Sequence, residues 1–299
     1  MACASETVPW RELTITLPAH LTDGVSQFLE DQGAQAVTFA EAGEEPLFEP
    51  KPGQTPLWQI VRLTALFSLD ADIESIARRM KAHHPGIDEP TLRILEDQPW
   101  ERLWLEHFKP LNFGSLWVCP SGQPPPTSDG VCLELDPGLA FGTGTHATTA
   151  LCLEWLGRQD LNRLTVIDYG CGSGILAIAA LLLGAQKVIA CDIDPQALTA
   201  TRDNAAKNQV AERLECCYPQ DMPEMTADLL LANILAGPLI DMASDLAARI
   251  RVGGRIILSG ILEAQVGEII RAYQPCQIQF ETPTIMDQWA RLTGTKRPE

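Results

Sequence analysis

A glycine-rich turn between two apolar segments is the feature that most restricts how this chain can fold. Residues 166–174 read Val-Ile-Asp-Tyr-Gly-Cys-Gly-Ser-Gly. They join a predicted strand at residues 164–168 to a predicted helix at residues 175–183. Glycines at such a turn let the backbone approach a ligand closely and direct amide N–H groups at it. The segment therefore predicts the first strand, turn and helix of a nucleotide-binding α/β domain.

The spacing of these glycines restricts the kind of nucleotide. Gly170, Gly172 and Gly174 follow the pattern G-x-G-x-G, and Ile175 stands where the dinucleotide pattern G-x-G-x-x-G needs its third glycine. The chain also has no Gly-Lys-Ser/Thr sequence of the P-loop type. A ligand without phosphates fits this turn better. An NAD-dependent oxidoreductase is disfavoured on the same spacing, and a non-catalytic cofactor-binding module is a further alternative.

The rest of the second half alternates between apolar strands and helices, as expected of an open, doubly wound α/β sheet. Asp194 is the predicted N-cap of the helix that begins at Pro195. The predicted strands after the glycine turn are residues 187–192, 228–233, 255–259, 276–280 and 288–293. The predicted helices are residues 195–207, 238–250 and 264–273, with a Gly253-Gly254 turn before the strand at 255.

The first 95 residues have a different pattern. Strands are predicted at residues 12–17, 36–40, 58–67 and 91–95, and helices at residues 20–32 and 70–83. The order β-α-β-β-α-β is typical of a ferredoxin-like unit. We therefore expect a smaller α+β domain at residues 1–96, a linker helix at 97–112 and the α/β domain at 113–299. Trp100 and Trp104 recur at helical spacing, which favours a packing stripe over a ligand site.

Composition excludes several classes of protein. Of the 299 residues 45% are hydrophobic and 20% charged, which is ordinary for a globular protein, and no apolar run reaches the ~20 residues of a membrane span. The nine cysteines include no C-x-x-C pair, so we expect free thiols and no metal site. The first residues do not resemble a secretory signal, which predicts a cytoplasmic protein.

The formal charge of −17 repels phosphate backbones, so stable binding to nucleic acid is not expected. Two readings of this acidity stay open: it keeps the protein soluble, or it also recruits a basic partner.

The glycine turn and the second strand resemble the Rossmann-like methyltransferases, whose cofactor is S-adenosyl-L-methionine. The first motif of that family, Asp-x-Gly-x-Gly-x-Gly, is matched by Asp168, Gly170, Gly172 and Gly174. The acidic residue that binds both ribose hydroxyls in that family is matched by Asp192, 22 positions after Gly170. One carboxylate suits two neighbouring hydroxyls, because each can donate to a separate oxygen. The alternative for Asp192 is a capping role before the next helix.

Two further segments carry polar groups suited to a site. Residues 138–149 read Gly-Leu-Ala-Phe-Gly-Thr-Gly-Thr-His-Ala-Thr-Thr. Their backbone N–H groups and threonine hydroxyls could bind a ligand, or they could only form a turn that caps the next helix. Asn233 ends a predicted strand at the mouth of the crevice, where its carbonyl could accept from an acceptor amine or from the adenine, or where it could only terminate the strand. Ile234, Leu235 and Ala236 follow it in place of the Pro-Pro-Tyr of many amino-group methyltransferases, which favours an aliphatic amine as acceptor. His146 is expected to pack or cap rather than act as a base.

Together with residues 97–110, these motifs resemble the bacterial ribosomal protein L11 methyltransferase family across most of the chain; Pro99 and Ala147 depart from its pattern. The resemblance implies a seven-stranded methyltransferase domain after a ferredoxin-like substrate-recognition domain. It implies transfer of methyl groups to lysine amines and the N-terminal amine of a basic ribosomal protein, by a monomer. The implied cofactor contacts are Thr149, Gly170, Asp192 and Asn233, with Asp168 and Gly172 beside them and Asn233 orienting the amine. Methyltransferases acting on another protein, RNA or a small-molecule amine share the catalytic half.

Overall fold

The computed structural model describes residues 9–42, 58–95, 109–127, 129–135 and 146–298. The chain divides into two compact units, Met1–Leu103 and Trp104–Glu299. Gly138 to Thr145 of the threonine-rich segment, and most of the predicted linker helix, lie outside the described residues.

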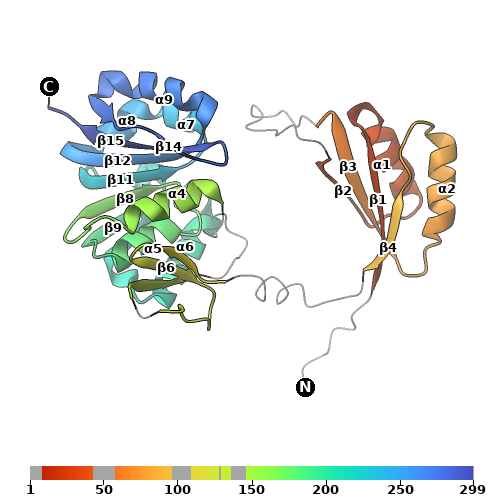
Figure 1. The fold of residues 1–299 in the computed structure, drawn as a ribbon, viewed down its shortest axis with the longest axis horizontal. Coiled ribbons are helices and arrows are strands. Elements are labelled where there is room, and N and C mark those ends of the chain that lie inside the picture. Colours follow the sequence, from red (N-terminus) through yellow and green to blue (C-terminus); the bar gives the residue numbers. More distant parts are fainter. Residues whose placement is uncertain (1–8, 43–57, 96–108, 128, 136–145, 299) are drawn as a thin grey trace. The chain divides into compact units, whose positions relative to one another are not determined.

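The first unit is one four-stranded antiparallel sheet with two helices on one face (Figure 1). The sheet order is β2-β3-β1-β4, as a ferredoxin-like chain order produces. Alternate residues of the central strands, such as Leu13 and Leu63, are fully buried against the helices. The elements are β1 (Trp10–Pro18), the 3₁₀ turn η1 (Ala19–Leu21), α1 (Thr22–Asp31), β2 (Ala36–Glu41), β3 (Ile60–Ser68), α2 (Ile73–His83) and β4 (Thr91–Leu95).

The second unit is built on an eight-stranded sheet of order β10-β9-β8-β11-β12-β15-β13, with β14 pairing to β15. This confirms the doubly wound fold: seven strands form the expected sheet, and the short strand β14 pairs with β15 at Trp289–Arg291, whereas β13 pairs with it at Gly294–Lys296. Strands β8 to β12 are parallel, whereas β15 runs antiparallel to β12. The strands are β8 (Thr165–Tyr169), β9 (Lys187–Cys191), β10 (Leu214–Cys217), β11 (Ala227–Asn233), β12 (Ile250–Leu262), β13 (Ile278–Phe280), β14 (Thr284–Met286) and β15 (Trp289–Lys296).

Helices cover both faces of this sheet (Figure 1). On one face lie α4 (Ala147–Leu156), α5 (Ile175–Leu182) and α6 (Pro195–Lys207). On the other lie α7 (Ala236–Asp241), α8 (Ala243–Ala248) and α9 (Val266–Tyr273). Strand β8 is buried on both sides, because Val166 packs under the first set of helices and Ile167 under the second.

Several element boundaries differ from the sequence predictions. The helix predicted at residues 238–250 is divided into α7 and α8 at Met242, and Ile250 already belongs to β12. The Gly253-Gly254 turn lies inside β12 rather than before it. The strand predicted from residue 276 begins at Ile278, because Gln277 has a left-handed backbone with φ of 61°.

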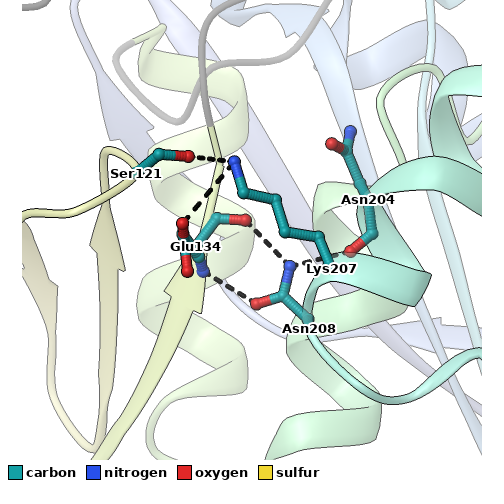
Figure 2. A network of polar contacts seen from close by, with 5 residues as sticks. All are labelled: Ser121, Glu134, Asn204, Lys207 and Asn208. Atoms are coloured by element: carbon teal, nitrogen blue, oxygen red, sulfur yellow. Dashed lines mark hydrogen bonds and ion pairs between the residues drawn. The ribbon is translucent and has the colours of Figure 1, made fainter.

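A small third sheet joins the second unit. It consists of β5 (Leu111–Phe113), β6 (Leu116–Cys119) and β7 (Val131–Glu134), and it packs on α4 and α5. Residues 111 and 112 of the predicted linker helix therefore belong to a strand, where Leu111 pairs with Val118. Figure 2 shows how Asn208, just after α6, holds the end of β7: its side chain accepts from the Glu134 amide and donates to the Glu134 carbonyl, both at 2.8 Å.

Candidate active site

The candidate site lies at the carboxyl ends of β8, β9 and β11, where the strand order reverses. A cavity of about 490 Å³ opens there, a size suited to a small ligand. Its lining is mostly apolar, and Thr149, Asp192 and Asn233 are among its few polar groups. The other lining residues are Tyr169, Gly170, Cys171, Gly172, Ile175, Leu176, Ile193, Pro219, Ile234, Leu235, Pro238 and Met242.

The glycine turn follows β8 directly and forms one wall of the cavity. Gly170, Gly172 and Gly174 all have positive φ, between 53° and 79°. A Cβ on Gly170 would lie 2.3 Å from the Cγ2 of Ile234, and one on Gly174 would lie 2.8 Å from Thr201. These two positions therefore need glycine for space as well as for backbone conformation.

Helix α6 holds the turn from behind. The Thr201 hydroxyl donates to the Gly172 carbonyl at 3.0 Å, and the Asn204 side-chain amide donates to the Ser173 carbonyl at 2.8 Å. Sequence reasoning missed these two supports, although both residues lie on the helix that follows Asp192. Their spacing of three residues is that of one helix face, but the periodicity does not reveal which backbone they reach.

Asp192 lies at the end of β9 and lines the cavity. Its Oδ2 accepts from the Gly172 amide at 2.9 Å, and its Oδ1 accepts from the Asp194 amide at 3.0 Å. Asp194, not Asp192, caps α6, because its side chain accepts from the Gln196 amide at 2.8 Å. Asp192 is thereby fixed against the glycine turn with its carboxylate at the cavity wall.

Asp168 does not line the cavity. It is 1% exposed, and its Oδ2 accepts from the Ala177 amide in the first turn of α5 at 2.9 Å. The pKa of Asp168 is raised to about 7, chiefly by burial; the Ala177 hydrogen bond lowers it and the nearby Asp192 charge raises it. The structure thus places Asp168 under the glycine turn, where it fixes the start of α5 rather than facing a ligand.

Thr149 and Asn233 meet across the cavity from α4 and β11. The Asn233 side-chain amide donates to the Thr149 hydroxyl at 3.2 Å. This orientation makes the Oδ1 atom of Asn233 the one that can accept from a ligand. The sequence separates the two residues by 84 positions, so only the fold brings them together.

His146 caps α4. Its Nδ1 accepts from the Thr148 amide at 3.4 Å and contacts the Thr148 hydroxyl at 2.8 Å, while its ring meets the edge of Trp289 with centroids 5.2 Å apart. These contacts are those of a capping and packing residue.

Apolar side chains lie at the mouth of the cavity; Leu235 was expected there from the sequence, whereas Ile193 was not. Ile193 is 82% exposed and Leu235 49% exposed, although both line the cavity. On the inner side, the Tyr169 hydroxyl donates to the Met242 sulfur at 3.3 Å. Large exposed apolar side chains at a cavity mouth are typical of a ligand surface. The sequence signal for Ile193 was its position directly after Asp192.

The strand order, the glycine turn and the acidic residue after β9 define the class of Rossmann-like methyltransferases. A sequence model described as ribosomal protein L11 methyltransferase matches residues 9–297. The chain therefore belongs to the ribosomal protein L11 methyltransferase family.

Individual relatives agree with this assignment. Proteins named ribosomal protein L11 methyltransferase from Methylococcus capsulatus and Nitrosococcus oceani are 48% and 49% identical to this chain. The matches cover 96% and 97% of this chain and 99% and 100% of those proteins. A crystal structure described as ribosomal protein L11 methylase from Lactobacillus delbrueckii subsp. bulgaricus matches with a TM-score of 0.59 and 34% identity, over 64% of this chain and 100% of that one.

Among the residues that the structure describes, no helix has the length and apolarity needed to cross a bilayer. No group of three or more His, Cys, Asp or Glu side chains in the described ranges is arranged to hold a metal ion.

Proposed function

We propose that the protein binds S-adenosyl-L-methionine in the cavity and transfers its methyl group to lysine amines and the N-terminal amine of ribosomal protein L11. The observation that carries the proposal is that Thr149, Gly170, Asp192 and Asn233 line one cavity. These four residues are separated by up to 84 positions in the sequence, and they are the ones that the family resemblance implies as cofactor contacts.

The residues present fit such a cofactor. The cavity lining contains the Asp192 carboxylate for two ribose hydroxyls, and its apolar side chains suit an adenine ring. No Lys or Arg is among the described lining residues, in agreement with a ligand that carries no phosphate. The glycine turn presents backbone where a Cβ at Gly170 would collide with Ile234. We assign Asp192 to the ribose, and Thr149, Gly170 and Gly172 to the walls around the cofactor.

When bound, S-adenosyl-L-methionine supplies a methyl group on a positively charged sulfur. The accepting amine must be neutral to attack, and for a lysine of pKa ~10.4 this costs about 4.6 kcal/mol at pH 7, against about 1 kcal/mol for an α-amine of pKa ~7.7. The apolar mouth formed by Ile193 and Leu235 reduces this cost, because burial disfavours the ammonium.

Asn233 orients the amine. Its Nδ2 atom is engaged with Thr149, so Oδ1 accepts from an N–H of the neutral amine and directs the lone pair toward the methyl group. We assign no general base, since His146 is used as the cap of α4.

We also propose that residues 1–96 recognise the ribosomal protein, that residues 97–110 connect the two units and that the chain from Leu111, the first residue of β5, to residue 299 catalyses the reaction. The first unit has its own core, and the open face of its sheet carries polar side chains including Thr14, Thr64, Arg62 and Arg93. The net charge of −17 favours a basic partner and opposes stable binding to nucleic acid. We expect the protein to be cytoplasmic and monomeric. Light scattering measures its mass in solution and so tests the oligomeric state.

The deciding experiment combines the full-length protein with radiolabelled S-adenosyl-L-methionine and ribosomal proteins purified from a strain that lacks this methyltransferase. We expect label in L11 and mass increases of about 14 Da per methyl group. Asn233→Ala should reduce kcat about a hundredfold, since it removes an orienting group. Label in RNA or in a small-molecule fraction alone would overturn the proposed substrate, and an absence of heat on titrating S-adenosylhomocysteine would overturn the proposed cofactor.

A further inference from the structure

A buried hydroxyl on β12 connects the two sides of the site. Ser259 is fully buried, and its Oγ lies 3.0 Å from the carbonyl of Thr148, which is 111 residues away in the sequence. The Ala290 carbonyl lies farther from the same oxygen, at 3.4 Å. A hydroxyl has one proton to donate, so the shorter contact to Thr148 is the better hydrogen bond.

Ser259 is adjacent to both of the polar residues that meet across the cavity. In the parallel ladder of β11 and β12 it lies opposite Asn233. Its hydroxyl binds the residue that precedes Thr149, and Thr149 in turn accepts from Asn233 at 3.2 Å. Strands β11 and β12 are thus connected to the first turn of α4 twice, at Thr149 by Asn233 and at Thr148 by Ser259.

The backbone at this point is built for the contact. The ladder between β12 and β15 shifts register between Leu258 and Ile261, and Gly260 has a left-handed φ of 81°. Such bulges re-aim the neighbouring side chain. Gly260 also lies close to the backbone of Ile234. A Cβ at position 260 would be only 2.3 Å from the Ile234 carbonyl oxygen, so the position requires glycine.

The Ser259 bond is not needed to hold α4 as a whole. Leu151, Cys152 and Leu153 of this helix are almost fully buried in the core. Arg291 of β15 also donates to the Leu151 carbonyl at 2.8 Å. The effect of the Ser259 hydroxyl therefore falls on the first turn of α4, where Thr149 lies.

We propose that Ser259 is a positioning residue for methyl transfer. Its hydroxyl fixes the first turn of α4 against β12, so that the Thr149 hydroxyl stays within hydrogen-bonding distance of Asn233. This inference rests on the proposed function, because it takes Thr149 and Asn233 as residues of the cofactor site.

The test compares Ser259→Ala with Thr293→Val. Thr293 is 2% exposed on β15, and its hydroxyl has no hydrogen-bond partner in the part of the chain that the structure describes, so its loss controls for removing a buried hydroxyl from the same sheet. We expect Ser259→Ala to lower kcat/KM about tenfold and to weaken S-adenosylhomocysteine binding about fivefold, and Thr293→Val to stay within about twofold of the wild type. Melting temperatures of both variants are measured in parallel.

A double variant identifies the path of the effect. Thr149→Val removes the hydroxyl that Ser259 is proposed to position. Adding Ser259→Ala to that variant should therefore lower kcat/KM by less than about a further twofold. The inference is wrong if the fold-losses in kcat/KM of the two single variants multiply in the double variant. It is also wrong if Ser259→Ala has the same kcat/KM as Thr293→Val. If Ser259→Ala does not fold, Ser259→Cys, whose thiol is a poor donor, takes its place in the same comparison.

The single variants separate this inference from the proposed function. If neither Thr149→Val nor Asn233→Ala changes cofactor binding or kcat, the proposed site is wrong. If those two variants are impaired and Ser259→Ala is not, only the role of Ser259 is wrong.

Discussion

Asp192 is the residue on which cofactor affinity should depend most. Its two oxygens accept from the Gly172 and Asp194 amides, which fixes the carboxylate at the cavity wall. In Asp192→Asn, one oxygen becomes an NH₂ group that cannot accept, and the negative charge is lost. We expect KM for S-adenosyl-L-methionine to rise about thirtyfold with kcat changed less than about threefold. The matched control is Asp194→Asn, which keeps an N-cap and should leave KM unchanged. Steady-state kinetics with equal effects for both variants would contradict the assignment.

Asp168 should make stability depend on pH. Burial raises its pKa from 3.8 to about 7, so between these values the folded protein binds a proton that the unfolded chain has released. The free energy of unfolding then decreases as pH rises through this range and levels off above about pH 7. Relative to Asp168→Asn, the wild type should lose about 1.4 kcal/mol of stability per pH unit between pH 5 and 7. Urea unfolding at pH 5, 6, 7 and 8 measures this difference. Parallel pH profiles for the two proteins would show that Asp168 is ionised throughout.

How far sequence predicts single residues depends on how they make contact. Gly170 and Asp192 follow adjacent strands, so their meeting at one sheet edge follows from the chain order. The contact of Ser259 with Thr148 depends on a bulge in β12 and on the position of α4, and neither has a local signal. Asp168 matched the motif, but the match did not indicate its burial behind the turn.

At the scale of elements, the bounds of a helix were predicted correctly where the sequence has capping residues at its ends. Helix α6 begins at Pro195 after the Asp194 cap and ends at Lys207, as predicted. The segment from Ala236 has no such end signals, and packing divides it at Met242 into two helices of six residues. Strand β10 was not predicted because four residues give too short a pattern.

Asn208 attaches the small three-stranded sheet to α6, and its removal should be costly. Its side chain makes three hydrogen bonds of 2.8 Å, two with the Glu134 backbone and one to the Asn204 carbonyl (Figure 2). Asn208→Ala leaves the Glu134 amide and carbonyl without these partners, so we expect about 2 kcal/mol of destabilisation. The control is Lys207→Ala, which breaks a partly exposed ion pair with Glu134 at 3.6 Å and an exposed hydrogen bond to Ser121, and it should cost less than about 1 kcal/mol. Urea unfolding of both variants measures the two losses of unfolding free energy. Equal losses would show that the Asn208 hydrogen bonds stabilise the protein no more than the Lys207 contacts do.

At the scale of the whole molecule, the sequence predicted two kinds of sheet from two kinds of pattern. Alternating polar and apolar residues gave the antiparallel sheet of the first unit, which is covered on one face. Continuous apolar runs gave the parallel strands of the second, which are covered on both. The β5–β6–β7 sheet was missed because its strands are only three or four residues long.

The separate cores lead to a prediction about the division of labour. Leu13, Leu29 and Phe67 belong to a core of the first unit, whereas the described residues that line the cavity belong to the second. A fragment of residues 104–299 should therefore fold and bind S-adenosylhomocysteine within about threefold of the full chain, because it keeps both large-sheet cores. The same fragment should lose methyl transfer to L11 by at least about a hundredfold, since the proposed recognition unit is absent.

Calorimetry and labelled-cofactor assays on the fragment measure the two quantities separately. Full methyl transfer by the fragment would place substrate recognition in the second unit. Loss of cofactor binding in a folded fragment would show instead that the first unit contributes to the cavity.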